Sequence, residues 1–400
     1  MLVADNYQLT YCTNIHPGEN WKVTFDNLKK YVPVIKQEVA PTQKFGLGLR
    51  LSNKASEELA ADNNLFDFKR WLNQEDIYVF TMNGFPFGNF HGERVKDMVH
   101  APDWTTEDRL VYTKRLFHQL SELLPEGISG GISTSPISYK YWHKSEEDRI
   151  KAMSVGAKHM LQVAIQLYET ESESGKYMHL DIEPEPDGLL ENSDEVVHYF
   201  TDYLLPIGIP MFMDKFDLDE ETAAERIKKY LTVCYDICHF SLAFENPKDT
   251  FAKFDSNGIR VGKIQVSAAL KILFDKTNAS NIWEALEKFN EPTYLHQVTR
   301  LNNGKVRTYS DLPELFADKN NPTELRAHFH VPIFLEEFDY LNSTQDQILD
   351  VLEYLREHPK LSEHLEVETY TWDVLPPHLK SDLSESIVRE LQWLKNRLEG

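Results

Sequence analysis

Eight short apolar stretches alternate with helix-like segments along the chain, and this alternation constrains the fold more than any other feature. The predicted strands are residues 8–14, 45–51, 77–81, 127–134, 177–183, 231–235, 259–267 and 365–371. The predicted helices are residues 24–39, 56–73, 105–124, 145–169, 194–205, 219–230, 249–255, 344–358 and 381–398. Strands that alternate with helices pair in parallel through right-handed crossovers, so eight such units predict an α/β fold of the (β/α)8 TIM-barrel type.

The chain is longer than this fold requires. It has 400 residues, whereas a barrel of this type typically has about 250. We expect much of the excess in an insertion after the seventh strand, approximately residues 268–324, with a helix at 282–289 and a hairpin formed by 294–300 and 306–309. No Pro/Gly/Ser-rich linker, repeat or low-complexity tract divides the chain. We therefore predict one TIM-barrel domain over residues 1–400.

Charge and cysteine content narrow the possible partners and compartment. The formal net charge is −22 and there is no run of Lys or Arg, which disfavours binding to nucleic acid. Small molecules or other proteins are the expected partners. The three cysteines (Cys12, Cys234 and Cys238) argue for a reducing compartment and against a disulfide framework. With no apolar run of bilayer length and no signal-peptide pattern, the expected location is the cytoplasm. A buried thiol is the first interpretation of Cys238, and a metal ligand is the alternative.

Three acidic residues lie at the predicted carboxyl ends of barrel strands. Glu183 ends the fifth strand, Asp236 follows the sixth and Glu368 lies in the eighth. The carboxyl ends of barrel strands meet at one mouth, where three acids would raise one another's pKa values unless a cation compensates. His239, three residues after Asp236, adds an imidazole. The sequence therefore predicts a divalent metal site, for Mn, Fe, Co, Zn or Mg.

Each of these signals also has a structural interpretation. Glu183 could cap a strand, with its carboxylate in solvent. Asp236 could cap a helix that also packs His239. Glu368 could form a solvated acidic pair with Glu366. The metal site is favoured because the three acids fall at matching strand ends, so that one barrel would bring them together.

Five further residues are candidates for an additional metal or for substrate contacts. His16 follows the first strand, and His91 and Lys96 lie in a long loop after the third. His328 and His330 follow the seventh strand, where a solvated turn is the structural alternative to a ligand pair.

Several stretches resemble a known family. The order of Glu183, Asp236-x-x-His239 and Glu368 resembles the xylose isomerase-like TIM barrels. Within that superfamily the chain looks like the EboE family, the metabolite traffic proteins of ebo gene clusters. The stretches that carry this resemblance are residues 11–19, 47–54, 83–96, 233–239, 262–267, 328–332 and 368–376.

The resemblance implies roles for individual residues. Glu183 and Glu368 would bind metal and transfer protons, Asp236 would be a metal ligand, and His239 would be a ligand or a substrate contact. The chain departs from the epimerases of the superfamily on the seventh strand, where a metal-binding His is replaced by Gln265. An amide oxygen can bind a hard cation, although it binds a transition metal less strongly than imidazole does.

Two functions remain open from the sequence. The first is a metal-dependent isomerase or epimerase that acts on a sugar-like small metabolite. The second is a non-catalytic protein that binds a metabolite for handling or transport, together with protein partners from the same gene cluster. Clustered carboxylates favour the first, and Gln265 and the insertion favour the second.

Overall fold

We describe the chain from a computed structural model. The structure describes residues 1–400 except 89–95, 276, 292, 303–304, 319–322, 373–374 and 378–379. None of the helices in this described part is long and apolar enough to cross a membrane.

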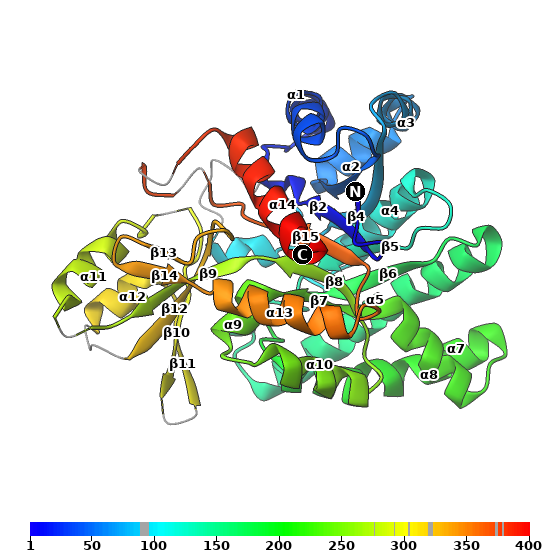
Figure 1. The fold of residues 1–400 in the computed structure, drawn as a ribbon. Coiled ribbons are helices and arrows are strands. Elements are labelled where there is room, and N and C mark those ends of the chain that lie inside the picture. Colours follow the sequence, from blue (N-terminus) through cyan, green and yellow to red (C-terminus); the bar gives the residue numbers. More distant parts are fainter. Residues whose placement is uncertain are drawn as a thin grey trace.

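Eight parallel strands form the barrel, as the sequence predicted (Figure 1). They are β2 (Tyr7–Tyr11), β3 (Phe45–Arg50), β4 (Ile77–Asn83), β5 (Gly130–Thr134), β6 (Met178–Ile182), β7 (Leu231–Asp236), β8 (Val261–Val266) and β15 (His364–Val367). Strand β15 pairs in parallel with both β8 and β2. Between β2 and β3 the ring is held by one bridge, Cys12 to Gly48, and by the backbone nitrogen of Gly48, which donates to Oγ1 of Thr10 at 3.0 Å. A short strand, β1 (Leu2–Val3), pairs antiparallel with β2.

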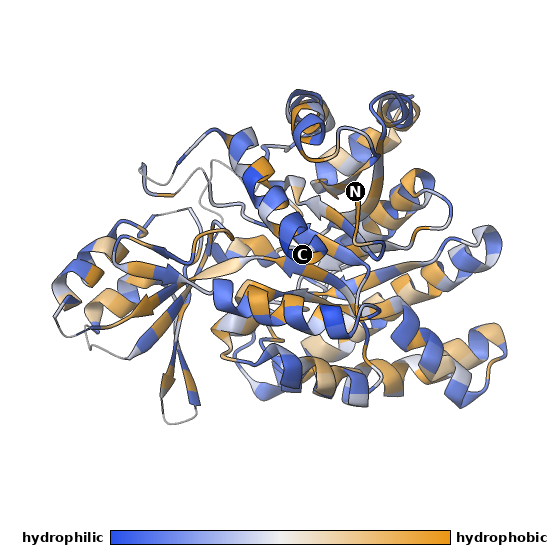
Figure 2. Cartoon of the chain, viewed as in Figure 1, coloured by the Kyte–Doolittle hydropathy of each residue, from blue (hydrophilic) through white to orange (hydrophobic). Residues whose placement is uncertain are grey.

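Helices surround the barrel. They are α1 (Trp21–Val39), α2 (Asn53–Ala60), α3 (Asn64–Gln74), α4 (Glu107–Leu123), α5 (Glu146–Ser174), α6 (Ser193–Tyr199), α7 (Leu205–Phe216), α8 (Glu220–Tyr230), α9 (Ile237–Leu242), α10 (Pro247–Ser256), α13 (Gln345–Glu357) and α14 (Leu383–Glu399). The caps follow the sequence: Oγ of Ser145 accepts from the backbone nitrogen of Asp148 in a capping box, and Thr106 caps α4. Figure 2 shows hydrophobic and hydrophilic residues side by side on these helices, as expected for helices with one apolar face on the barrel.

Two predicted helices have other boundaries in the structure. The helix expected over residues 194–205 is α6 and a π-helical turn (Phe200–Leu204), and α7 continues the helical path to Phe216. The single helix expected over residues 56–73 is two helices, α2 and α3. Asp62 lies between them with a positive φ of 51°, which an α-helix does not tolerate. The break was missed because the apolar spacing continues across it.

The insertion after β8 is a six-stranded antiparallel sheet, which lies at the left of the barrel in Figure 1. Its order is β11-β10-β12-β9-β14-β13. The elements are β9 (Ala268–Leu273), α11 (Ala279–Glu287), β10 (Val298–Asn302), β11 (Lys305–Tyr309), α12 (Leu312–Ala317), β12 (Glu324–Val331), β13 (Glu337–Phe338) and β14 (Leu341–Ser343). The predicted hairpin is confirmed as β10 and β11. The sheet runs to Ser343, past the residue at which we expected the insertion to end, and the division of the chain into domains stays a prediction.

His328 and His330 are not in a loop or a turn. Both lie on β12 and both are buried. The pairing of β12 with β9 is irregular between Ala327 and His330, and the two imidazoles lie close together, with ring centroids 5.6 Å apart. Strand β12 lies against helix α9, which carries His239. The inserted sheet thus brings two histidines to the barrel mouth.

Candidate metal centre

Three buried carboxylates meet at the carboxyl ends of three barrel strands. Asp236 is the last residue of β7, and Glu183 and Glu368 directly follow β6 and β15. One oxygen of each carboxylate lies within 4.8 Å of one oxygen of each of the others. None of the three residues is more than 4% exposed. The structure therefore brings together the three acids that the sequence placed at strand ends.

Two oxygens of this group have no hydrogen-bond donor. Oδ1 of Asp236 accepts from the hydroxyl of Ser267 at 2.7 Å and from the backbone nitrogen of His239 at 3.2 Å, so this residue does cap α9. Oδ2 of Asp236 and Oε2 of Glu183 accept no hydrogen bond from the residues that the structure describes. Buried oxygens in this situation are costly, and a divalent cation would satisfy both.

Glu368 is held by two amides. Its Oε1 accepts from the side-chain nitrogens of Asn14 at 2.7 Å and Asn83 at 3.0 Å. Asn14 lies just after β2 and Asn83 ends β4, so the ends of two other barrel strands fix the orientation of this carboxylate.

The three acids differ in how readily they ionise. Burial, followed by the charges of Glu368 and Asp236, raises the pKa of Glu183 well above its ordinary value. Burial and then the charge of Asp236 do the same to the pKa of Glu368. Burial would also raise the pKa of Asp236, but His239 and His330 lower it below its ordinary value. Asp236 is thus the preferred carboxylate, while Glu183 and Glu368 retain protons unless a cation replaces them.

A cavity of about 70 Å³ opens over Glu183 and Glu368, and Asp236 is not among the described residues that line it. The described residues that line it are Asn14, Asn83, Phe85, Pro86, Lys96, Val99, His100, Glu183, Glu185, His239, Tyr294, Leu295, Gln297, His328, Glu368 and Tyr370. Polar groups from the barrel and apolar groups from the loops and the inserted sheet face one small space, which is typical of a site for a small ligand.

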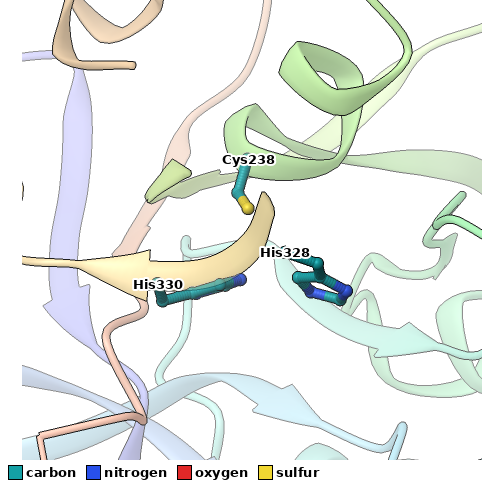
Figure 3. Close-up of side chains that lie close together, drawn as sticks. All are labelled: Cys238, His328 and His330. Atoms are coloured by element: carbon teal, nitrogen blue, oxygen red, sulfur yellow. The ribbon is translucent and has the colours of Figure 1, made fainter. Parts of the chain in front are cut away.

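A second group of metal-binding side chains adjoins the acids. Ligand atoms of Cys238, His328 and His330 lie within 4.8 Å of one another, and so do those of Asp236, His239 and His330 and those of Glu185, His239 and His328. Figure 3 shows Cys238 extending from α9 toward β12, where both imidazoles lie on the same side of the strand. Burial, followed by the charge of Asp236, raises the pKa of the Cys238 thiol well above its ordinary value.

The other predicted residues have different surroundings. Gln265 is buried in β8, opposite Asp236 on β7 and Glu366 on β15, and it is not among the described residues that line the cavity. His16 stacks on Tyr31 at 4.5 Å and is not among the described residues that line the cavity. Lys96 lines the cavity and forms an ion pair of 2.6 Å with Asp311 of the inserted sheet region. His91 lies outside the described residues.

The sequence did not single out Glu185, His100 or Gln297 as site residues. Glu185 follows Glu183 by two residues, and its Oε1 lies 2.9 Å from Nε2 of His100. Both are buried against the cavity. The repeated acid of Glu183-Pro-Glu-Pro186 was the available signal for Glu185. No local pattern pointed to the other two.

Comparison with known proteins supports the fold. No family model matches this chain, and no curated protein matches it. Among solved structures, a xylose isomerase-like TIM barrel protein from Mycobacterium smegmatis in complex with magnesium has a TM-score of 0.51 at 10% identity, and the match covers 100% of this chain and 99% of the other. This chain has the fold of a xylose isomerase-like TIM barrel.

Two further structures are similar over nearly their whole length. One is a D-tagatose 3-epimerase-like protein, with a TM-score of 0.49 and 11% identity, which covers 98% of this chain and 97% of its own. The other is the IOLI protein with a bound zinc atom, with a TM-score of 0.47 and 11% identity, which covers 98% of each chain. Structures with bound magnesium and zinc thus occur among the neighbours, and this chain has groups that could hold a metal.

Proposed function

We propose that this protein is a metal-dependent isomerase or epimerase that acts on a small, sugar-like metabolite. The observation that carries the proposal is the convergence of Glu183, Asp236 and Glu368 within 4.8 Å of one another beneath a cavity. They would hold a divalent cation. Such a cation would satisfy Oδ2 of Asp236 and Oε2 of Glu183, which accept no hydrogen bond from the described residues. The epimerase-like neighbour agrees with this choice of reaction class.

The protein's own side chains would move the proton. A bound cation would polarise a carbonyl group of the substrate and the hydroxyl group next to it. Glu183 and Glu368 both line the cavity, so their carboxyl groups could exchange a proton with a ligand bound there. One would remove a proton bound to carbon, and the other would return it.

The cavity walls fit a polyhydroxylated ligand. The amides of Asn14, Asn83 and Gln297 line it, and their nitrogens also donate to Glu368 and to the carbonyl oxygen of Pro186, which fixes their orientation. Phe85 and Tyr370 cover its apolar side. A few directed polar groups on a largely apolar wall orient a small ligand and exclude water from it.

Deuterium exchange tests the proposal without knowledge of the product. Pentuloses, hexuloses and their phosphates would be incubated in D2O with Mg²⁺, Mn²⁺, Co²⁺ or Zn²⁺ and followed by proton NMR. We expect deuterium at a carbon next to the carbonyl of at least one sugar, and a rate at least about 100-fold lower in Glu183→Gln. Glu173→Gln, on the exposed end of α5, should behave as wild type. An unchanged rate in Glu183→Gln would rule out this role.

A second candidate is a metabolite-binding protein without catalysis, in keeping with the EboE resemblance. The observation that favours it is Gln265, buried beside Asp236 where the epimerases carry a histidine. In this case Gln265 would complete a weaker site for a hard cation, and partners from the same gene cluster would exchange the metabolite in the cytoplasm. This candidate predicts a metabolite that stays bound through purification and no deuterium exchange. Any turnover by wild type would exclude it.

A further inference from the structure

A second and larger cavity lies at the other end of the barrel, where the strands begin. Its volume is about 610 Å³, which is within the range of sites that bind metabolites. The lining residues fall in short segments at the starts of four barrel strands, namely 125–129 before β5, 174–179 at β6, 260–262 at β8 and 360–363 before β15. The cavity therefore opens at the amino-terminal mouth of the barrel, opposite the three acids.

A histidine paired with an aspartate faces this cavity. His179 of β6 lines the cavity and is 3% exposed. Its Nδ1 lies 2.6 Å from Oδ1 of Asp181. That oxygen also accepts from the hydroxyl of Thr232, so it acts as an acceptor and Nδ1 of His179 donates to it. A neutral imidazole carries one proton, so its Nε2 retains a lone pair. Within the described part of the chain the hydrogen bonds of His179 involve Nδ1, which leaves Nε2 for a ligand.

Two glycines make the space for this pair. A Cβ at Gly262 of β8 would lie 2.0 Å from Oδ1 of Asp181, and a Cβ at Gly131 of β5 would lie 2.5 Å from Cε1 of His179. A side chain at either position would force the pair to move. Apolar side chains would fill the same space at lower cost, because the burial of polar groups is penalised. The chain thus keeps a polar pair where packing alone does not require one.

The polar groups around this pair do not satisfy one another. Oδ2 of Asp181 and Nδ1 of His364 have no hydrogen-bond partner among the described residues, and both residues are at most 1% exposed. His364 lies beside His179, with ring centroids 5.2 Å apart. Its Nε2 lies 3.1 Å from the carbonyl oxygen of Ser129, a residue of the cavity wall. A network that served only to stabilise the barrel would be expected to satisfy its buried atoms.

Basic side chains surround the same cavity. Lys176, Arg260 and Lys360 line it and come from three different segments, and the acids that line it are Glu126 and Glu363. The described lining therefore has three basic and two acidic side chains, in a chain whose net charge is −22. A local excess of positive charge in such a chain favours an anionic group.

We propose that the amino-terminal mouth binds a small hydroxylated metabolite that carries an oxyanion, either a phosphate or a carboxylate. The oxyanion would lie among Lys176, Arg260 and Lys360, and a hydroxyl group of the ligand would donate to Nε2 of His179. No described residue lines both this cavity and the one over the acids. The inference therefore goes beyond the proposed function and does not depend on it.

Calorimetric titration of the full chain with ribose 5-phosphate, gluconate and ribose tests the inference. The first two probes carry a phosphate and a carboxylate, and ribose carries neither. We expect heat of binding from at least one of the two anions and none from ribose. The probe that binds identifies the oxyanion. Absence of heat with both anions would overturn the inference.

A double variant assigns the heat to this cavity. Arg260→Gln/Lys360→Gln should weaken binding at least about 10-fold, because charge-assisted hydrogen bonds to the oxyanion are lost. Both side chains are exposed, so the fold should be unaffected. Lys151→Gln/Lys158→Gln, at exposed positions of α5, makes the same change in net charge and should bind as wild type does. Equal affinity in the two double variants would overturn the inference.

Two further measurements separate this cavity from the one over the acids. Binding should persist in the presence of a chelator and in Glu183→Gln, because the three acids lie at the other end of the barrel. Binding that requires a divalent cation would place the ligand over the acids and overturn the inference. In protein labelled with ¹⁵N-histidine, the ligand should shift the Nε2 signal of His179, which is identified by its loss in His179→Gln. A shift confined to other histidines would contradict the contact with His179.

Discussion

The barrel interior contains two layers of buried charge that are balanced in different ways. In the lower layer Lys263 on β8 contacts Glu366 on β15, and both side chains are fully buried. The upper layer contains Glu183, Asp236 and Glu368, at the carboxyl ends of β6, β7 and β15. Glu368 lies two residues after Glu366. Lys263 and Glu366 form one ion pair of opposite charges, and the buried Asp181 nearby contacts Nδ1 of His179 at 2.6 Å. The upper layer holds three acids within 4.8 Å of one another.

The difference shows where the chain supplies its own cation and where it does not. Glu366 raises the pKa of Lys263 against the opposing effect of burial. Burial raises the pKa of Glu366, and Lys263 opposes that shift, so each partner favours the charged form of the other. Glycine at position 48 leaves room for the Glu366 carboxylate, because a Cβ at Gly48 would lie 1.8 Å from Oε1 of Glu366. In the upper layer the imbalance persists and favours an ion from outside. The lower layer is thus structural, and the upper layer suits a functional role.

The strongest test of this contrast is Lys263→Met. The variant removes the cation and leaves Glu366 buried without its partner, which should cost about 3–5 kcal/mol of unfolding free energy. Urea unfolding measures it. The double variant Lys263→Met/Glu366→Leu should recover most of the loss, because an apolar pair often replaces a buried ion pair without cost.

A matched control is Lys69→Met. Lys69 pairs with Glu122 at 3.0 Å, but both side chains are more than 40% exposed, so the loss should stay below about 1 kcal/mol. Equal effects of Lys263→Met and Lys69→Met would contradict the structural role of the lower layer.

Glu390 of α14 provides a second test, outside both layers. It is 1% exposed and accepts from the hydroxyl of Thr369 at 2.7 Å and from the backbone nitrogen of Ile333 at 3.2 Å. Burial raises its pKa from 4.5 to about 7. A raised pKa favours folding below pH 4.5, and this contribution is lost as the pH rises through 7.

We therefore expect Glu390→Gln to be more stable than wild type at pH 8, by up to about 3 kcal/mol at about 1.4 kcal/mol per pKa unit. The difference should shrink toward pH 5. Thermal unfolding between pH 5 and pH 8 measures both. A difference that does not depend on pH would show that Glu390 does not titrate in this range.

The sequence predicted the barrel well because the barrel strands are short, largely apolar stretches that are separated by helices of regular spacing. It also placed Glu183, Asp236 and Glu368 together, since parallel strands all end at one mouth. It failed where burial depends on distant partners. Ala327-His-Phe-His-Val331 alternates polar and apolar residues as a strand does, but the histidines suggested solvent, because nothing local shows that α9 and the barrel mouth cover them.

Glu185 was missed for a related reason. Its neighbour Glu183 already explained an acid at the end of the fifth strand, and a second acid after a proline resembled a solvated turn. Its environment is set by His100, 85 positions earlier in the chain, at 2.9 Å. A contact across such a separation leaves no periodic pattern in the sequence.

The smallest expected effect concerns the upper layer without metal. Burial and neighbouring acids raise the pKa of Glu183, so its contribution to stability is present below the ordinary carboxyl pKa and is lost as the pH rises. In the metal-free protein at pH 8, Glu183→Gln should be more stable than wild type by about 1–3 kcal/mol, the usual cost of an unsatisfied buried polar group. With a saturating divalent cation the order should reverse, because wild type has all three carboxylates and gains more binding energy from the cation than the variant does. Thermal unfolding with chelator and with Mg²⁺ or Zn²⁺ measures both states, and Glu173→Gln serves as the exposed control. A variant less stable than wild type in chelator would mean that the upper layer, like the lower one, is balanced by the chain itself.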